Sequence, residues 1–385
     1  MSTSLLSKVS YGKYFSFFTG SGFLDLGFET SGFHTAAVNE FHEPFLNAYK
    51  HSRKIMSLTE PKFGYYHCSV EEFVSDGKYV DILGDQVSTL QQADELVGFI
   101  GGPPCPDFSV GGKNKGHEGE NGRLSRTYTD AIIQHKPDFF LFENVKGLWR
   151  TKRHREFYEQ LKADLRNAGY VITDHLVNCI QFGAPQDRDR IFMFGIKKHH
   201  VVNVLDEKSI NDMSIPAEFF DWESHTTFAR DEALKSPFWP STEPFSDSKE
   251  NTMPGGIIPS LTVEYWFEKN DVINHPNASA FFTPKSDKFR LVEEGDTSKK
   301  SFKRLHRWRY SPTAAYGNNE VHLHPYKARR ISAAEALAIQ SLPKNFELPY
   351  GMTLSDKFKT IGNGVPYLAA KGIAKTINDF MHKIK

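Results

Sequence analysis

The sequence predicts an α/β protein: an open, doubly wound sheet accompanied by a second, smaller and irregular domain. Short apolar segments of strand length alternate with segments of helical periodicity up to about residue 196. Several of these apolar segments end in residues that can do chemistry, which is typical of the carboxyl ends of strands in open α/β sheets. From residue 197 the alternation gives way to a long stretch rich in Ser, Pro, Asp and aromatic residues. We therefore expect one domain over residues 1–196 and 345–385, interrupted by a second over residues 197–344.

Composition limits the class of protein. The 385 residues are enough for two or three domains, and 47 basic residues balance 47 acidic ones. Nucleic-acid binding must therefore depend on local basic patches, because the net charge is zero. The three cysteines have no metal-binding spacing and form no disulfide framework, which predicts a reducing, cytoplasmic location and no metal. No basic-then-apolar signal opens the chain, and no apolar run approaches membrane-spanning length.

The first expected strand, residues 14–18, leads into a glycine turn. Gly20 and Gly22 permit a tight turn and the close approach of a ligand to the backbone. A helix is expected next, followed by a strand over residues 34–38 that ends beside Glu40. A carboxylate about 20 residues beyond such a turn commonly binds a ribose hydroxyl. This pattern suits NAD and S-adenosylmethionine equally well.

Cys105 follows an apolar segment over residues 96–100 and the run Gly101-Gly102-Pro103-Pro104. The prolines fix their own φ and hold the preceding residues extended, so the sulfur is held in a set position. A positioned cysteine can act as a nucleophile when it is a thiolate. Taken alone, however, most single cysteines at strand ends are small apolar packing residues.

Two further strand ends carry charged residues. The apolar segment 138–145 ends in Glu143, and the segment Gln186-Asp187-Arg188-Asp189-Arg190 runs into a strand over residues 191–196. Side chains alternate in an extended chain, so Gln186, Arg188 and Arg190 should share one face. A thiol, a carboxylate and two guanidinium groups at the strand ends of one sheet are typical of an active site. Two arginines alone would fit a solvated strand edge equally well.

In this order, the motifs resemble those of the DNA cytosine-5 methyltransferase family of bacterial restriction–modification systems. Residues 18–22 resemble the cofactor loop, 103–105 the nucleophile motif, 143–145 the acid motif and 186–190 the paired-arginine motif. Residues 330–336 and 361–366 resemble the last two conserved blocks, so the resemblance covers about 14–196 and 328–384. Two departures are Pro106-Asp107, where the family usually has glutamine, and Phe23, where a further glycine is common.

The resemblance implies a Rossmann-like, S-adenosylmethionine-dependent methyltransferase domain. Cys105 would attack C6 of a flipped-out cytosine, Glu143 would protonate N3, Arg190 would bind O2 and Arg188 would support the site. The spacing departs from the strict dinucleotide fingerprint and no hydride-transfer residues are evident, which favours S-adenosylmethionine over NAD. Asp85 is expected to hold the adenine, with Asp81 and Ser69 as weaker alternatives. The remaining expected cofactor contacts are Phe18, Gly20, Ser21, Gly22, Glu40 and Asn363.

In the family, residues 197–327 correspond to the variable target-recognition region. A basic run near its end contains an aromatic residue, Trp308, and no acidic residue. Such runs are usually solvated surface, but here the position favours contact with DNA phosphates. The expected DNA-binding residues are Ser109, in the glycine-rich loop after the nucleophile, and Lys299, Lys300, Lys303, Arg304 and Arg307.

We expect a monomer that acts on double-stranded DNA, with a possible cognate restriction endonuclease. Two alternatives stay open: a methyltransferase that acts on cytosine in transfer RNA, and a non-catalytic DNA-binding relative. The latter would be expected to have lost Cys105, Glu143 or Arg190, and all three are present. At the carboxyl end, Ser332 and Glu335 predict a capping box, and residues 367–384 predict a terminal helix that packs on the first domain.

Overall fold

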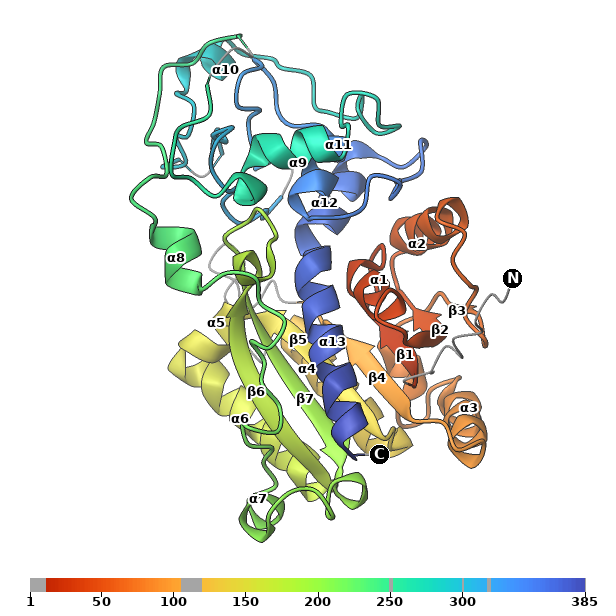
Figure 1. The fold of residues 1–385 in the computed structure, drawn as a ribbon. Helices are drawn as coiled ribbons and strands as arrows, with labels where there is room; N and C mark the ends of the chain where they lie inside the picture. The colour runs from red at the N-terminus through yellow and green to blue at the C-terminus, as the bar shows by residue number, and fades with distance from the viewer. Residues whose placement is uncertain (1–11, 105–119, 249–251, 300, 317–319, 385) are drawn as a thin grey trace, which may run out of the picture.

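A seven-stranded sheet forms the lower part of the molecule (Figure 1). The computed structural model describes residues 12–104, 120–248, 252–299, 301–316 and 320–384. The order of strands across the sheet is β3-β2-β1-β4-β5-β7-β6. The strands are β1 (Lys13–Phe17), β2 (His34–Asn39), β3 (Tyr65–Tyr66), β4 (Val97–Gly101), β5 (Phe139–Val145), β6 (Tyr170–Asn178) and β7 (Asp189–Lys197).

The directions of the strands bring several strand ends together. Strands β1 to β5 are mutually parallel, whereas β7 runs antiparallel to both β5 and β6. Gly101 at the end of β4 lies opposite Phe142 of β5, and Val145 at the end of β5 lies opposite Arg190 of β7. The carboxyl ends of β1, β2, β4 and β5 therefore meet the amino end of β7 at one edge, which we call the site edge.

Helices cover both faces of the sheet. Helices α1 and α13 pack on one face, and α3, α4 and α6 pack on the other (Figure 1). Burial on both faces explains why the strands are almost continuously apolar: Phe139 and Leu141 face one layer, and Phe140 and Phe142 face the other. The helices are α1 (Phe23–Glu29), α2 (Glu43–Ile55), α3 (Val80–Gln92), α4 (Glu120–His135), α5 (Lys146–Arg150), α6 (Lys152–Asn167), α7 (Glu207–Asn211), α8 (Arg230–Lys235), α9 (Val263–Lys269), α10 (Lys288–Leu291), α11 (Ala333–Ile339), α12 (Leu354–Asn363) and α13 (Tyr367–Ile384).

The upper part of Figure 1 contains residues 229–348, which we call the irregular region. It holds α8 to α11 and a short 3-10 helix, η5 (Pro259–Leu261). Among its described residues, β pairing is limited to isolated bridges such as Glu243 with Glu294. Its apolar core, which includes Trp266 and Leu337, continues into α12 and onto Phe23 of α1.

The expected domain boundary at residue 197 does not coincide with a break in packing. After β7 the chain forms a 3-10 helix, η4 (Lys198–His200), and returns along the sheet. Val201, Leu205, Phe220 and Trp222 are buried in the same apolar cluster as α13. The backbone of Ile172 in β6 exchanges hydrogen bonds with this segment, at Met213 and Ile215. Residues 197–222 therefore pack as part of the sheet layer, and the irregular region begins later than the sequence suggested.

The doubly wound α/β sheet and most individual elements agree with expectation. The five predicted strands are β1, β2, β4, β5 and β7, and the terminal helix α13 spans the predicted residues. Both hydrogen bonds of the predicted capping box are present: the Ser332 side chain accepts from the amide of Glu335, and the Glu335 side chain accepts from the amide of Ser332. Strands β3 and β6 were not predicted. No helix among the described residues is long and apolar enough to cross a membrane.

Candidate active site

The glycine turn lies at the site edge, directly after β1. Phe18, Gly20 and Gly22 all have positive φ, at 54°, 56° and 81°. A Cβ atom at Gly22 would lie 2.4 Å from Nη1 of Arg53, so this position admits only glycine. The amide of Gly20 donates a 2.7 Å hydrogen bond to Oε2 of Glu40. The expected cofactor loop and the expected ribose-binding carboxylate are thus in direct contact.

Glu40 is held with its carboxylate toward the loop. It is buried, and its Oε1 also accepts a 2.8 Å hydrogen bond from the amide of His42. Burial raises the pKa of Glu40, and the backbone hydrogen bonds oppose that rise. The next residue, Phe41, is 72% exposed.

A buried arginine supports the loop from beneath. Arg53 of α2 donates hydrogen bonds to the carbonyl oxygens of Ser21 (3.1 Å) and Gly22 (2.8 Å). Its guanidinium pairs with Glu29 at 3.0 Å and lies over the ring of Tyr49. Sequence reasoning missed Arg53 because 31 positions separate it from Gly22 and no local pattern marks the contact.

Helix α12 closes the other side of the loop. The hydroxyl of Thr360 lies 2.7 Å from that of Ser21. Asn363 ends the same helix, one turn beyond Thr360, and its side chain is exposed. The structure therefore brings the carboxyl-terminal motif to the glycine turn, as the resemblance implied.

The three candidates for the adenine contact lie in different places. Asp85 lies in the middle of α3 with its side chain exposed, and Asp81 is also exposed on this helix. Helix α3 lies beside the start of β4, away from α12 and the glycine turn (Figure 1). Ser69 instead follows β3 at the site edge, where Asn39 of β2 donates a 2.8 Å hydrogen bond to the carbonyl of Cys68. Of the three candidates, Ser69 alone is near the loop.

The second half of the site is a buried ion pair. Oε1 of Glu143 in β5 lies 2.8 Å from Nε of Arg190 in β7, and both side chains are about nine-tenths buried. A Cβ atom at Gly102 would lie 2.5 Å from Oε2 of Glu143, so glycine is needed for this approach. Asn144 also donates a 3.4 Å hydrogen bond to the carbonyl of Pro103. The segment that leads to the expected nucleophile therefore lies against the acid.

Burial raises the pKa of Glu143, while the positive charges of Arg190 and Arg188 oppose the rise. A carboxyl group with a raised pKa can hold and deliver a proton, which is the role expected of it. Cys105 and Ser109 lie outside the described residues.

Arg188 is turned toward the backbone. Its guanidinium donates to the carbonyl oxygens of Ala314 (3.2 Å) and Gly362 (2.7 Å). Burial and the charge of Arg190 lower its pKa to about 9. Gln186 accepts a 2.9 Å hydrogen bond from the amide of Ala314. These contacts join the start of β7, the irregular region and the end of α12.

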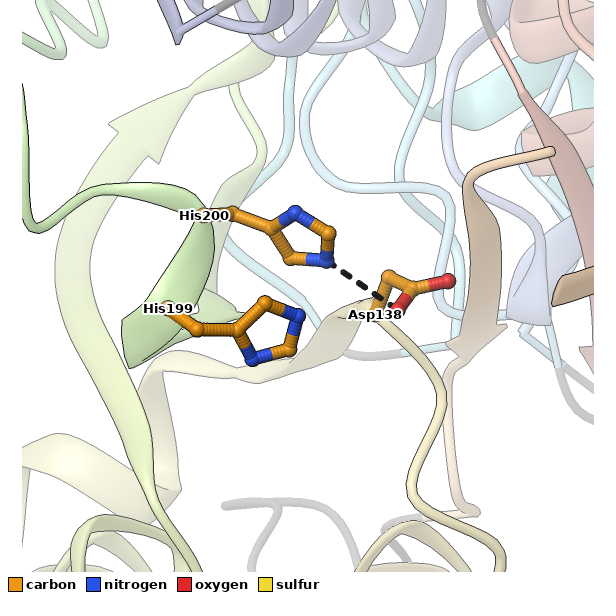
Figure 2. A group of neighbouring side chains, drawn as sticks. All are labelled: Asp138, His199 and His200. Carbon is orange, nitrogen blue, oxygen red and sulfur yellow. Dashed lines mark hydrogen bonds and ion pairs between the residues drawn. The ribbon is translucent and has the colours of Figure 1, made fainter. Parts of the chain in front are cut away.

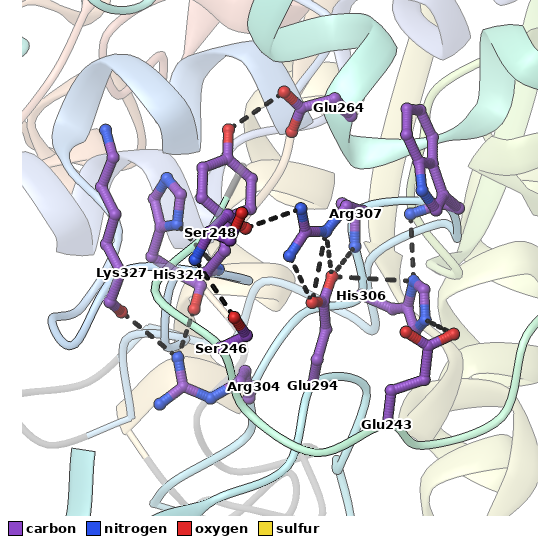
Figure 3. Close-up of polar contacts among 12 residues, drawn as sticks. Glu243, Ser246, Ser248, Glu264, Glu294, Arg304, His306, Arg307, His324 and Lys327 are labelled. Carbon is purple, nitrogen blue, oxygen red and sulfur yellow. Dashed lines mark hydrogen bonds and ion pairs between the residues drawn. The ribbon is translucent and has the colours of Figure 1, made fainter. Parts of the chain in front are cut away.

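The arginines and the lysines of the expected basic run differ in burial. Arg304 and Arg307 are in the interior, where Arg307 makes a bidentate pair with Glu294, with a shortest distance of 2.8 Å (Figure 3). Their assignment as phosphate contacts is therefore corrected, because their donors are used inside the protein. Lys299 is exposed and Lys303 is half-buried, while Lys300 lies outside the described residues.

The chain is similar to known methyltransferases. The chain is 56% identical to the Type II methyltransferase M.NmeDI of Neisseria meningitidis serogroup C, over 95% of this chain and 83% of that protein. It is 27% identical to M.FnuDI of Fusobacterium nucleatum, over 97% of both chains.

Solved structures with the same fold include a protein described as a DNA modification methyltransferase encoded within an E. coli prophage. Its TM-score is 0.59 at 22% identity, covering 96% of this chain and 99% of that one. The Dnmt2 methyltransferase of S. pombe gives a TM-score of 0.54 at 12% identity, covering 96% and 98%. The family model for C-5 cytosine-specific DNA methylases matches residues 12–379. The chain therefore belongs to the C-5 cytosine-specific DNA methylase family.

Proposed function

We propose that this DNA methylase transfers a methyl group from S-adenosylmethionine to C5 of a flipped-out cytosine in a specific duplex sequence, through a covalent bond between Cys105 and C6. The observation that carries the proposal is the buried Glu143–Arg190 pair, which lies against Gly102 at the same edge as the Glu40 loop. A proton donor and a cofactor cradle thus share one edge of the sheet.

The residues around the glycine turn fit S-adenosylmethionine. Its ribose hydroxyls suit the buried carboxylate of Glu40, and its adenine suits the exposed ring of Phe41 and the hydroxyl of Ser69. Gly20 and Gly22 leave room for close approach at the backbone, and Asn363 would close the pocket. When bound, the cofactor supplies an electrophilic methyl group on a sulfonium sulfur.

Cys105, Glu143 and Arg190 would together make C5 of cytosine reactive toward the methyl group. The Cys105 thiolate adds to C6 as Glu143 delivers its proton to N3, so negative charge does not accumulate on the ring. Arg190 holds Glu143 in place and provides fixed positive charge near O2. After C5 has taken the methyl group, a base removes the C5 proton, the C6–sulfur bond breaks, and Glu143 recovers its proton from N3. Arg188 acts as a positioning residue, because its donors are used on backbone carbonyls.

The target would be double-stranded DNA, read by the irregular region. Family membership favours DNA over transfer RNA, and an enzyme over a non-catalytic relative. A stacked cytosine presents neither face of C6 to a thiol, so the base must leave the duplex. We further propose that the enzyme acts as a monomer and that a restriction endonuclease of the same specificity accompanies it.

Bisulfite sequencing of plasmid DNA from a host that expresses the chain would identify the methylated sequence. A duplex of that sequence with 5-fluorocytosine at the target should then trap the enzyme in a complex that resists denaturant, because fluorine blocks the final elimination. Cys105→Ser should abolish trapping and methylation, while Cys68→Ser, which changes a half-buried thiol after β3, should retain both. Trapping by Cys105→Ser would refute the assigned nucleophile.

A further inference from the structure

Three ligand-type side chains meet at the edge of the sheet opposite the site edge. Asp138 directly precedes β5, and His199 and His200 belong to η4, directly after β7. Because β5 and β7 are antiparallel, with Phe139 opposite Ile196, the start of one strand lies beside the end of the other. Figure 2 shows the His200 ring directed at the Asp138 carboxylate, with the His199 ring beside that of His200. None of these residues contributes to the proposed reaction.

The three groups are close enough to share one ion. One ligand atom from each residue lies within 4.8 Å of the others. Nε2 of His200 is 3.1 Å from Oδ1 of Asp138, and the two imidazole centroids are 4.0 Å apart. In a tetrahedral zinc site the ligand atoms are about 3.4 Å apart, so a rotation of the exposed His199 ring would bring it into place.

The carboxylate is already oriented by neighbours that are not ligands. The backbone amide of Val97 donates to Oδ2 of Asp138 at 2.9 Å, and Gln91 donates to Oδ1 at 3.1 Å. Outer contacts of this kind hold a ligand in position before the metal arrives. Asp138 is buried, whereas the histidines are exposed or half-buried, which leaves the cluster accessible from solvent.

We propose that Asp138, His199 and His200 form a binding site for a borderline transition-metal ion such as Zn²⁺. Two imidazoles and one carboxylate are the ligands that such ions prefer, and a fourth position would be left for water. Mg²⁺ and Ca²⁺ fit poorly because they require oxygen ligands. The sequence predicted no metal because its cysteines lack metal-binding spacing, and 61 positions separate Asp138 from His199.

The main opposing feature is Lys197. Its ammonium lies 3.9 Å from Oδ1 of Asp138 and is the present counter-charge of the carboxylate. This side chain is about one-fifth exposed, so it can turn outward when a divalent ion takes its place. The bound ion would connect the start of β5 to the end of β7, and would stabilise the folded chain because the unfolded chain lacks this arrangement.

The test uses full-length protein without a histidine tag, treated with EDTA and then titrated with ZnCl₂ in competition with a chromophoric chelator. His199→Gln and His200→Gln should each weaken binding of one Zn²⁺ equivalent about tenfold or more. His225→Gln is the matched control, because His225 pairs with Asp379 elsewhere on the surface. Zn²⁺ should also raise the melting temperature of the wild type but not that of His199→Gln.

Equal Zn²⁺ affinity in wild type and His199→Gln, or an equal loss in His225→Gln, would overturn the proposal. To exclude a thiol as the source of binding, the titration is repeated with Co²⁺. Nitrogen and oxygen ligands give weak visible bands, whereas a thiolate ligand adds an intense near-ultraviolet band. A thiolate band from the high-affinity equivalent would also overturn it.

Discussion

The sheet and the irregular region are stabilised in different ways. The sheet buries Phe, Leu, Ile and Val on both faces, and its backbone polar groups pair along the strands. The irregular region has few regular elements and instead buries charged and imidazole side chains at its centre (Figure 3). These buried side chains are Glu294, Arg304, His306, Arg307, His322 and His324.

Arg304 illustrates the reason for this difference. Its guanidinium donates hydrogen bonds to the carbonyl oxygens of Phe289, Val292, His324 and Lys327. Carbonyl groups in a buried segment without strands have no ladder partner and must find one elsewhere. A long side chain with five donors can satisfy several of them at once. The comparison teaches that an arginine in a region without strands can donate its hydrogen bonds to backbone carbonyl groups rather than to a ligand.

The largest expected effect comes from breaking the buried pair of Glu294 and Arg307. Arg307→Met should lower the free energy of unfolding of the irregular region by about 3–5 kcal/mol, because it leaves a buried carboxylate without its partner. Replacing both residues with apolar ones, as in Glu294→Leu with Arg307→Met, should restore much of this loss. Urea denaturation measures both.

Arg309→Met, two positions later and only half-buried, is the matched control and should cost far less. If Arg307→Met and Arg309→Met lose the same stability, the contrast between the two regions does not hold. S-adenosylmethionine binding should survive in Arg307→Met, since the cofactor loop belongs to the sheet.

Mild acidification should destabilise the irregular region and stabilise the sheet layer. Burial lowers the pKa of His322 to about 3 and that of His324 to about 4. Below about pH 6.5 the unfolded chain binds protons that these folded histidines do not, which costs ~2 kcal/mol for each at about pH 5. In α1, which packs on the sheet, burial raises the pKa of Asp25 to about 7. Between its unfolded value near 4 and pH 7, ionisation favours the unfolded chain, so acidification from pH 7 stabilises this part.

Hydrogen–deuterium exchange at neutral and mildly acidic pH, corrected for intrinsic rates, measures this difference. Peptides around residues 303–330 should lose protection in acid, while those of β1 and α1 should keep or gain it. Asp25→Asn should remove the gain in the sheet without altering the loss in the irregular region. A uniform response across the chain would contradict the prediction.

Cofactor binding should depend on residues at the site edge and not on the irregular region. Glu40→Ala should weaken S-adenosylmethionine binding by about 1–3 kcal/mol through the removal of hydrogen bonds, with unchanged affinity for DNA. Glu43→Ala, an exposed acid three positions later, is the control. Isothermal titration of Ser69→Ala and Asp85→Ala tests the proposed adenine contact: Ser69→Ala should weaken binding and Asp85→Ala should not. The reverse result would restore Asp85.

The smallest effect is expected at the surface of the irregular region. Neutralising Lys299, Lys300 and Lys303 together should weaken binding to target and scrambled duplexes alike, because lysines act as point charges toward phosphates. The slope of log affinity against log salt should fall by about one for each phosphate that the protein no longer neutralises. Filter binding at several salt concentrations measures this, with the exposed Lys375→Gln of α13 as the control. Weaker binding confined to the target duplex, with the same salt slope, would show that these lysines read bases.

The sequence by itself determined most of the sheet and which polar residues stand at its strand ends. Apolar segments with polar ends marked β1, β2, β4, β5 and β7, because strands buried on both faces must be continuously apolar and their ends must be polar. The motif order then located Glu40, Glu143 and Arg190. The short β3 left no such signal, and β6 was missed because polar residues interrupt its apolar pattern.

Tertiary structure alone decided the partners of charged residues. The sequence cannot distinguish a solvated arginine from Arg304 or Arg307, because burial depends on segments far along the chain that arrive to pair with them. The same holds for Arg53 beneath the cofactor loop, for the position of Ser69 near that loop, and for the meeting of Asp138 with His199. Local pattern determines which residues form an element, whereas the charge each residue faces is determined only when distant elements pack together.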